Sequence, residues 1–156
     1  MSVGGLPLSL QQRLSDDIKQ AMRAGEKLKL MALRSLLAAL RKDAMDSGKD
    51  LSEAEEIAIL QRGLKQRKES AEAFTKGNLP ELARKEEEEA EILGAYLPRQ
   101  LSDAELADAV AEAMRDTGGS GPKDMGKVMG RLLAKYKGHV DGGRAKDAVQ
   151  KALGTA

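Results

Sequence analysis

Apolar residues recur every three or four positions along almost the whole chain, which is the spacing of amphipathic helices. Glycines, prolines and serine–glutamate pairs interrupt this pattern at intervals. The first two periods predict helices over residues 9–24 and 27–47, the first ended by Gly25 and the second by Gly48. Because only two residues separate these periods, the two helices are expected to form an antiparallel hairpin.

Two more helical periods follow in the N-terminal part of the chain. Ser52 and Glu55 have the spacing of a capping box, and the apolar period after them predicts a long helix that ends at Gly77. Pro80 suits the first position of the next helix, because proline lacks the N–H that this position leaves unpaired. The expected buried face of that helix is formed by Leu82, Ala83, Ala90, Leu93 and Leu97. Residues 8–97 are therefore expected to form an N-terminal helical subdomain, a hairpin or bundle.

A proline marks the boundary between this subdomain and a smaller one. Pro98 cannot continue the preceding helix, and Ser102 with Glu105 supplies a capping box for a new helix. Two shorter apolar periods follow, and the glycine-rich stretch 118–121 is expected to be a flexible turn. Residues 98–156 thus predict a small C-terminal three-helix bundle. The predicted fold class is all-α, since no alternation typical of a strand exceeds a few residues.

The amino-acid composition limits the chemical reactions that the chain can support more than it limits the fold. The chain has no cysteine and a single histidine, His139, so a disulfide, a thiolate metal site and a cysteine nucleophile are excluded. We expect no catalytic residue, no metal site and no cofactor. The longest wholly apolar run is residues 36–40 and the N-terminus lacks a basic leader, so neither a membrane span nor a signal peptide is expected. The predicted location is the cytoplasm.

Charge is distributed unevenly along the chain. The net charge is +1, but residues 1–97 carry 16 Lys and Arg against 17 Asp and Glu, whereas residues 117–156 carry eight against three. A polyanion should therefore prefer the C-terminal third. Basic residues recur there every four positions, on the solvent side of the second helix of the predicted bundle. The candidate nucleic-acid-binding residues are Lys123, Lys127, Arg131 and Lys135, together with Lys137, Arg144 and Lys146.

Glycines in the same stretch allow more than one interpretation. The segment from Gly121 to Lys127 matches the phosphate-loop pattern G-x-x-x-x-G-K, but Val128 stands where Ser or Thr is needed and no strand precedes it. A helix start is therefore favoured. Gly126 and Gly130 lie inside the predicted helix, where each glycine costs about 1 kcal/mol relative to alanine. This cost indicates the close approach of a neighbouring helix or of an RNA backbone, and we favour the helix.

Three further features have ordinary structural explanations. Arg67 falls on the apolar side of its predicted helix, so it must extend to solvent or pair with a carboxylate. The acidic run 86–89 with Glu91 predicts a solvated face, because consecutive residues of a helix point in different directions. His139 has no candidate nucleophile nearby in the sequence, and we interpret it as a surface or RNA-facing histidine.

Five stretches of the chain together resemble one protein family. They are Ala32–Leu40, Leu64–Ser70, Tyr96–Ser102, Lys123–Gly130 and Lys137–Gly142. Over residues 8–153 the chain resembles the YqeY family, which is similar to the tail domain of GatB, the B subunit of the glutamine-dependent aspartyl/glutamyl-tRNA amidotransferase. The resemblance implies an N-terminal and a smaller C-terminal helical subdomain. It also implies tRNA as a partner, because that tail helps to hold the body of tRNA and similar domains are appended to some bacterial glutaminyl-tRNA synthetases.

The resemblance and the charge distribution together predict a non-catalytic tRNA-binding or tRNA-enzyme accessory module. An aminoacyl-tRNA synthetase or an amidotransferase is a further candidate partner. The alternative is a helical protein–protein adaptor, favoured by the near-zero net charge of residues 1–97. A third alternative, an amidotransferase-like carbon–nitrogen ligase with glutamine as amide donor, follows from the family label alone. Since no residue supports such catalysis, we expect no enzyme activity.

Overall fold

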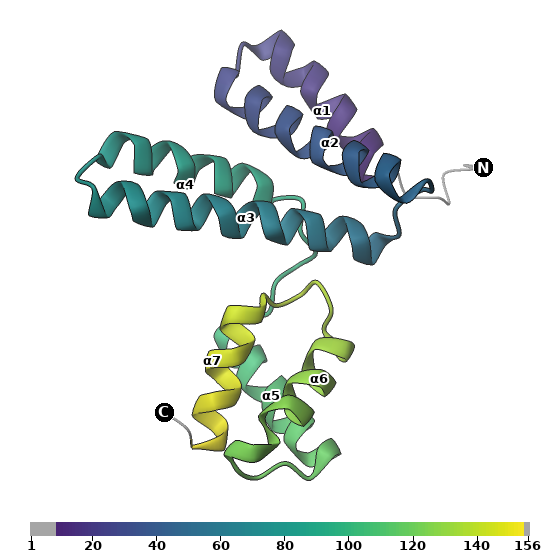
Figure 1. Ribbon diagram of the computed structural model, residues 1–156, viewed down its shortest axis with the longest axis vertical. Coiled ribbons are helices and arrows are strands. Elements are labelled where there is room, and N and C mark those ends of the chain that lie inside the picture. The colour runs from purple at the N-terminus through teal and green to yellow at the C-terminus, as the bar shows by residue number, and fades with distance from the viewer. Residues whose placement is uncertain (1–8, 155–156) are drawn as a thin grey trace. The chain divides into compact units, whose positions relative to one another are not determined.

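The computed structural model describes residues 9–154, and every regular element in this range is helical (Figure 1). The helices are α1 (Leu10–Ala24), α2 (Lys27–Ser47), α3 (Glu53–Lys76), α4 (Pro80–Gly94), α5 (Asp103–Thr117), α6 (Met125–Lys135) and α7 (Gly142–Leu153), with a 3₁₀ turn at Pro122–Asp124 before α6. The all-α fold class predicted from the sequence is confirmed. The ends expected for the two subdomains, at residues 8 and 156, lie outside the described range.

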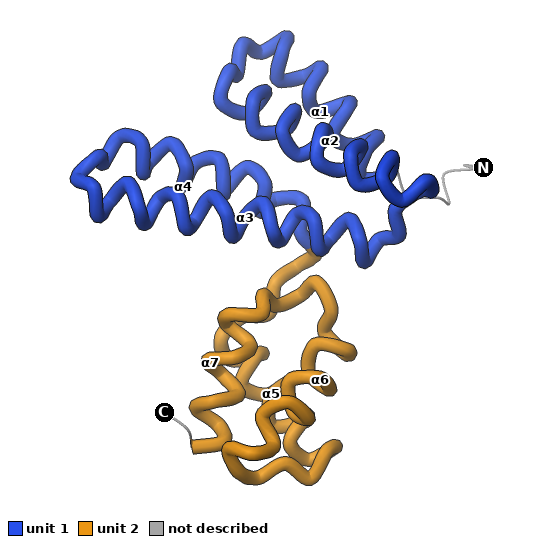
Figure 2. Tube along the Cα trace, viewed as in Figure 1, with its two compact units in different colours: residues 1–97 blue, residues 98–156 orange. Residues whose placement is uncertain are grey.

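The chain forms two compact units, residues 1–97 and residues 98–156 (Figure 2). Unit 1 contains helices α1 to α4, and unit 2 is a bundle of the three helices α5, α6 and α7. Among the described residues, no helix is both long enough and apolar enough to cross a membrane.

Serine caps begin three of the helices. At α3, Ser52 Oγ accepts a hydrogen bond from the Glu55 backbone N–H (3.1 Å), and the Glu55 carboxylate accepts one from the Ser52 backbone N–H (2.9 Å). The same reciprocal pair of bonds forms at Ser9 before α1 and at Ser102 before α5. A serine cap stabilises a helix by about 1 kcal/mol. Gly25, with φ at 72°, ends α1 in the left-handed conformation that glycine adopts most easily.

Two helical hairpins make up unit 1, and α2 lies at their junction. Helix α1 packs along α2, α3 packs along α4, and α2 also contacts both α3 and α4 (Figure 1). The core that joins the hairpins consists of Leu14, Ala32, Leu33, Leu36, Leu37, Leu40, Ile59, Leu60, Leu64 and Leu93. Full burial of one leucine side chain contributes roughly 1.5–3 kcal/mol, so this core is the main source of stability in the unit.

One ion pair lies inside unit 1, between α3 and α4. Arg67 Nε is 3.3 Å from Glu89 Oε2, and the two side chains are only 16% and 11% exposed. Arg67 therefore pairs with a carboxylate, which is one of the two outcomes expected for it. Glu89 differs from the prediction of a solvated acidic face. It lies four residues before the buried Leu93, so the two side chains share one face of α4.

Helix α4 begins at Pro80 as predicted, but it departs from the prediction at its C-terminal end and at one position of its buried face. Its last residue is Gly94, and the chain continues as a tight turn in which the Tyr96 N–H donates to the Leu93 carbonyl (3.1 Å). The proline at position 98 contributes to this early end, because a residue that precedes proline avoids helical backbone. Leu82, which was expected to be buried, is 44% exposed, since it lies one position off the buried face of the helix.

The glycine-rich turn of unit 2 is tightly packed, whereas the sequence predicted a flexible one. Gly118 ends α5 with φ at 72°, and the buried Gly119 follows it. A Cβ atom at Gly119 would lie 2.6 Å from Cγ2 of Val128, so a larger residue would push α6 away from the turn. The core beneath consists of Leu101, Leu106, Ala109, Val110, Ala113, Val128, Leu132, Val140, Ala145, Val149 and Leu153.

An arginine reinforces the cap of α5. The Arg99 guanidinium donates two hydrogen bonds to the Glu105 carboxylate (3.0 and 2.9 Å), which also accepts one from the Ser102 backbone N–H (2.9 Å). The bonds from Arg99, followed by the bond from Ser102, lower the pKa of Glu105 to about 2. The carboxylate is therefore ionised across the neutral range, where it accepts these hydrogen bonds at the first turn of α5.

Candidate nucleic-acid interface

The basic face of α6 begins at a turn that an aspartate holds in place. Asp124 Oδ2 accepts hydrogen bonds from the backbone N–H groups of Ser120 (3.0 Å) and Gly121 (3.3 Å). These two bonds lower the pKa of Asp124, that of Ser120 having the larger effect. Lys123 lies in the 3₁₀ turn, and Lys127 Nζ lies 3.7 Å from Asp124 Oδ1. The turn thus places the first two candidate cations at the start of the helix.

Further along α6, each exposed cation meets a carboxylate of α5. Arg131 donates to Asp116 Oδ2 through Nε (3.3 Å) and Nη2 (3.2 Å). Lys135 donates to Glu112, and this hydrogen bond raises the pKa of the lysine. These cations are exposed, as the four-residue spacing predicts, but they lie on the side of α6 next to α5, and Lys135 is only seven positions after the buried Val128. The sequence did not indicate that acidic residues of another helix would compensate their charge.

These ion pairs lower the positive electrostatic potential around α6, but its cations can still bind an anion. The arginine and lysine side chains in them remain about half exposed, and exposed pairs of this kind contribute only about 0–1 kcal/mol. A phosphate group can therefore replace the carboxylate at small cost. Unit 2 as a whole carries ten Lys and Arg against eight Asp and Glu, a net charge of +2.

The remaining candidate residues fall into two groups. The Arg144 guanidinium donates to the Leu101 carbonyl (3.0 Å) and to Asp103 Oδ1 (2.8 Å), so its charge is already engaged. Three candidate lysines, in contrast, have no carboxylate oxygen within 4.0 Å anywhere in residues 9–154. They are Lys123, Lys137 and Lys146. These three side chains are exposed, as are Arg115 and Lys151, which also have no carboxylate oxygen within 4.0 Å in the described part of unit 2.

The two glycines of α6 face open space. A Cβ atom at Gly126 or Gly130 would meet no atom within 4 Å beyond the local backbone of the helix. The favoured prediction, that a neighbouring helix packs against them, is therefore wrong for the part of the chain that the structure describes. Both glycines are exposed and alternate with the cations of α6, so they leave a strip of bare helix backbone on its surface.

A set of hydrogen bonds joins the first residues of unit 2 to the loop before α7, and we call it the 98–101 junction. Gln100 Nε2 donates to the Gly138 carbonyl (2.8 Å), and the Leu101 N–H donates to the His139 carbonyl (2.8 Å). His139 Nδ1 lies 2.8 Å from the Arg99 carbonyl, which can only accept, so Nδ1 carries the proton. His139 is thus half-buried and fixed in orientation. No local sequence signal predicted that these two segments meet.

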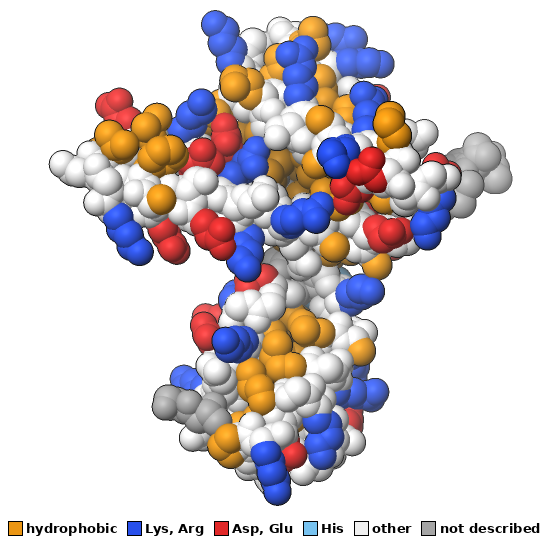
Figure 3. Space-filling view, viewed as in Figure 1, with side chains coloured by type: hydrophobic (Ala, Val, Ile, Leu, Met, Phe, Trp, Pro, Cys, Tyr) orange, Lys and Arg blue, Asp and Glu red, His pale blue; other side chains and the backbone are white. Residues whose placement is uncertain are grey.

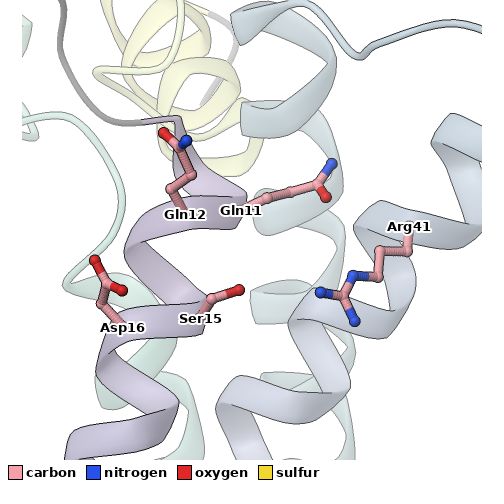
Figure 4. A pocket seen from close by; sticks show the side chains of 5 residues that line it. All are labelled: Gln11, Gln12, Ser15, Asp16 and Arg41. Atoms are coloured by element: carbon pink, nitrogen blue, oxygen red, sulfur yellow. The ribbon is translucent and has the colours of Figure 1, made fainter.

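Unit 1 contains a hollow that the sequence analysis did not identify. It lies between α1 and α2, has a volume of about 390 Å³, and is lined by Gln11, Gln12, Ser15, Asp16 and Arg41. Figure 4 shows Gln11 and Ser15 of α1 pointing toward Arg41 of α2, while Gln12 and Asp16 point the other way. Within residues 9–154, no group of three or more His, Asp or Glu side chains is placed to hold a metal ion.

These features define a class of small all-helical proteins with a cationic helix face in the C-terminal unit. The chain belongs to the YqeY family: the family model described as "Yqey-like protein" matches residues 11–153. This result confirms the resemblance found in the sequence.

Similar proteins come from fungi and carry the name "Altered inheritance of mitochondria protein 41, mitochondrial". The protein of Lachancea thermotolerans is 34% identical over 70% of this chain and 60% of its own length. That of Pyrenophora tritici-repentis is 25% identical over 91% of this chain and 80% of its own length. That of Saccharomyces cerevisiae is 26% identical over 76% and 68%. The predicted cytoplasmic location is therefore wrong, because these names point to mitochondria.

Proposed function

We propose that the protein is a non-catalytic module that binds tRNA or assists a tRNA enzyme. The observation that carries this proposal is the exposed face of α6, where lysines and arginines alternate with glycines that have open space above them. Backbone phosphates bind to cations, and a bare helix surface lets a bulky nucleic-acid strand come close. The resemblance to the tail domain of GatB agrees with tRNA as the nucleic acid.

The proposed recognition is of shape and backbone charge. Unit 2 contains a single aromatic residue, Tyr136, which is half-buried and lies under the ammonium group of Lys135. A surface with so few aromatic side chains offers little on which to stack an unpaired base. Binding should therefore extend to many tRNA species and weaken steeply as salt rises.

The absence of catalysis is part of the proposal. Glutamine-dependent amide transfer needs an activated nucleophile, and the chain has no cysteine. The hydroxyls of Ser9, Ser52 and Ser102 accept helix-capping hydrogen bonds, and the histidine Nδ1 donates to a backbone carbonyl. These contacts favour a binding protein over a carbon–nitrogen ligase.

The test replaces by glutamine, in the full chain, the three candidate lysines that have no carboxylate oxygen within 4.0 Å in residues 9–154: Lys123→Gln, Lys137→Gln and Lys146→Gln. Three lost phosphate contacts should flatten the dependence of log K on log salt by roughly 2–3, at about 0.7–0.9 per contact. The measurement is fluorescence anisotropy with bulk tRNA over a series of salt concentrations.

The matched control removes three exposed lysines of α3, Lys65, Lys68 and Lys76, which likewise have no carboxylate oxygen within 4.0 Å in the described chain. It should leave both the affinity and the slope unchanged. An unchanged slope in the unit 2 variant, or a larger effect in the control, would contradict the assignment of the interface.

A protein–protein adaptor is the second candidate function, and one observation favours it. Leu79 and Leu82, at the end of the α3–α4 hairpin, are 47% and 44% exposed and contribute apolar surface there (Figure 3). The same binding assay separates the two functions, because an adaptor that acts on a tRNA enzyme would leave free tRNA unbound.

A further inference from the structure

The near-zero charge of unit 1 is the sum of two hairpins of opposite sign. Residues 9–49, which form the α1–α2 hairpin, carry nine Lys and Arg against five Asp and Glu, a net charge of +4. Residues 53–94, which form the α3–α4 hairpin, carry seven against eleven, a net charge of −4. Figure 3 shows Lys and Arg side chains spread over the α1–α2 hairpin. This hairpin is therefore more basic than the whole of unit 2, and its field attracts polyanions.

The positive charge gathers on the outer face of α2. Lys27, Arg34, Arg41 and Lys42 are all exposed, and at 100° per residue they fall within one arc of the helix that contains no acidic residue. In the described chain, the guanidinium groups of Arg34 and Arg41 have no carboxylate within 4.0 Å. Arg34 Nη2 meets the sulfur of Met22, at 3.8 Å. The cations of α6 that face α5 form ion pairs with carboxylates, whereas these two arginines are available to bind an anion.

Neutral hydrogen-bond donors stand beside Arg41. The Ser15 hydroxyl and the Gln11 amide point toward its guanidinium across the hollow between α1 and α2 (Figure 4). A planar guanidinium with adjacent hydroxyl and amide donors matches the several oxygens of a phosphate group. The one carboxylate that lines the hollow, that of Asp16, points away from Arg41.

We propose that the outer face of the α1–α2 hairpin is a second phosphate-binding surface, which holds the backbone of an RNA through Arg34, Arg41 and the Ser15 hydroxyl. This inference rests on the proposed function, since it takes RNA to be the ligand. An acidic protein would present similar charge but also needs an apolar contact area. On α2, the exposed apolar residues of this face, Met31, Ala38 and Met45, follow one another at intervals of seven positions, or about 10 Å along the helix, and the exposed Met22 of α1 lies against Arg34. The cations Arg34, Arg41 and Lys42 stand between them along α2. These apolar residues form no continuous apolar patch.

The test is the double substitution Arg34→Gln with Arg41→Gln in the full chain. Two lost phosphate contacts should lower the slope of log K against log salt by about 1.4–1.8, which at about 0.1 M salt corresponds to a roughly 25- to 60-fold weaker affinity for bulk tRNA. Arg41→Lys, which keeps the charge and loses the planar donor pair, should have an intermediate effect. The control, Lys65→Gln with Lys68→Gln, removes the same charge from the acidic hairpin and should change neither quantity.

Each possible outcome decides between the two proposals. If the wild-type chain binds tRNA and the double variant binds it equally well with the same slope, this inference is wrong and the unit 2 interface stands. If the wild-type chain binds no tRNA, the proposed function fails and this inference fails with it. Loss of binding to poly-L-glutamate with tRNA binding intact would assign the face to an acidic protein and refute the inference. Thermal unfolding of each variant, which should match the wild type, separates these results from a folding defect.

Discussion

Replacing Gly130 by alanine should stabilise unit 2 and at the same time weaken its binding to RNA. The position lies in the interior of α6, its φ is not left-handed, and a Cβ atom there would meet no neighbour within 4 Å. Alanine is better than glycine in a helix interior by about 1 kcal/mol, and nothing in the described chain opposes that gain. Gly126 lies in the first turn of the helix, so Gly126→Ala should contribute less.

Hydrogen exchange and tRNA binding measure the two effects separately. A gain of about 1 kcal/mol should slow the exchange of the most protected amides of unit 2 roughly fivefold. The same methyl group occupies the bare strip where we expect the RNA backbone, so the affinity for bulk tRNA should fall. Ala111→Gly, at an exposed position in α5, is the reverse control: it should speed exchange by a similar factor and leave tRNA binding unchanged.

The combination of results matters more than either result alone. If Gly130→Ala stabilised the unit and bound tRNA with unchanged affinity, the glycines would have no role in close approach and the argument from α6 would be refuted. If the substitution destabilised the unit, the space above Gly130 would not be open as the structure has it.

Two other predictions concern buried and capping charges. Glu89→Gln leaves the charge of Arg67 without its partner at a nearly buried site, so the free energy of unfolding should fall by about 3–5 kcal/mol. The double variant Arg67→Met with Glu89→Leu, which removes both charges, should recover most of the lost stability. Urea denaturation of the two variants measures both changes. Because the folded pKa of Glu105 is lowered to about 2, its stabilising contribution is present above its ordinary pKa near 4.5 and is lost as pH falls from there toward 2. Acid unfolding of Glu105→Gln should show a weaker pH dependence in that window, and an unchanged profile would contradict the role of this cap.

The helices could be predicted because the residues that begin and end each helix lie at its boundaries in the sequence. Ser52 and Ser102 with their glutamates, and Gly25 and Gly48 after their apolar periods, act within a few residues of where they stand. The exceptions arise where a distant contact decides the outcome. Glu89 belongs to an acidic run that looks solvated in the sequence, and only the packing of α4 against α3 places it inside the unit.

The candidate site was less predictable than the fold for the same reason. The cations of α6 are exposed, as their four-residue spacing predicts, yet the partners of Arg131 and Lys135 come from residues of α5 that lie fifteen and 23 positions away. The net charge of residues 1–97 is near zero because it is the sum of two hairpins of opposite charge. The sequence pattern alone does not show which segments share a surface. The prediction for Gly126 and Gly130 failed because a glycine in a helix does not reveal what approaches it.

The 98–101 junction has a consequence for the order in which unit 2 folds. Its hydrogen bonds join residues that are 38 to 40 positions apart, whereas the turns of α5, α6 and α7 close over four. Closing a long loop costs more entropy than closing a short one, so helical turns form early and long-range contacts form late. During synthesis, residues 98–101 leave the ribosome before the rest of unit 2 and must wait for Gly138 and His139 before they can be fixed. The segment that enters the unit first is thus the last to become ordered.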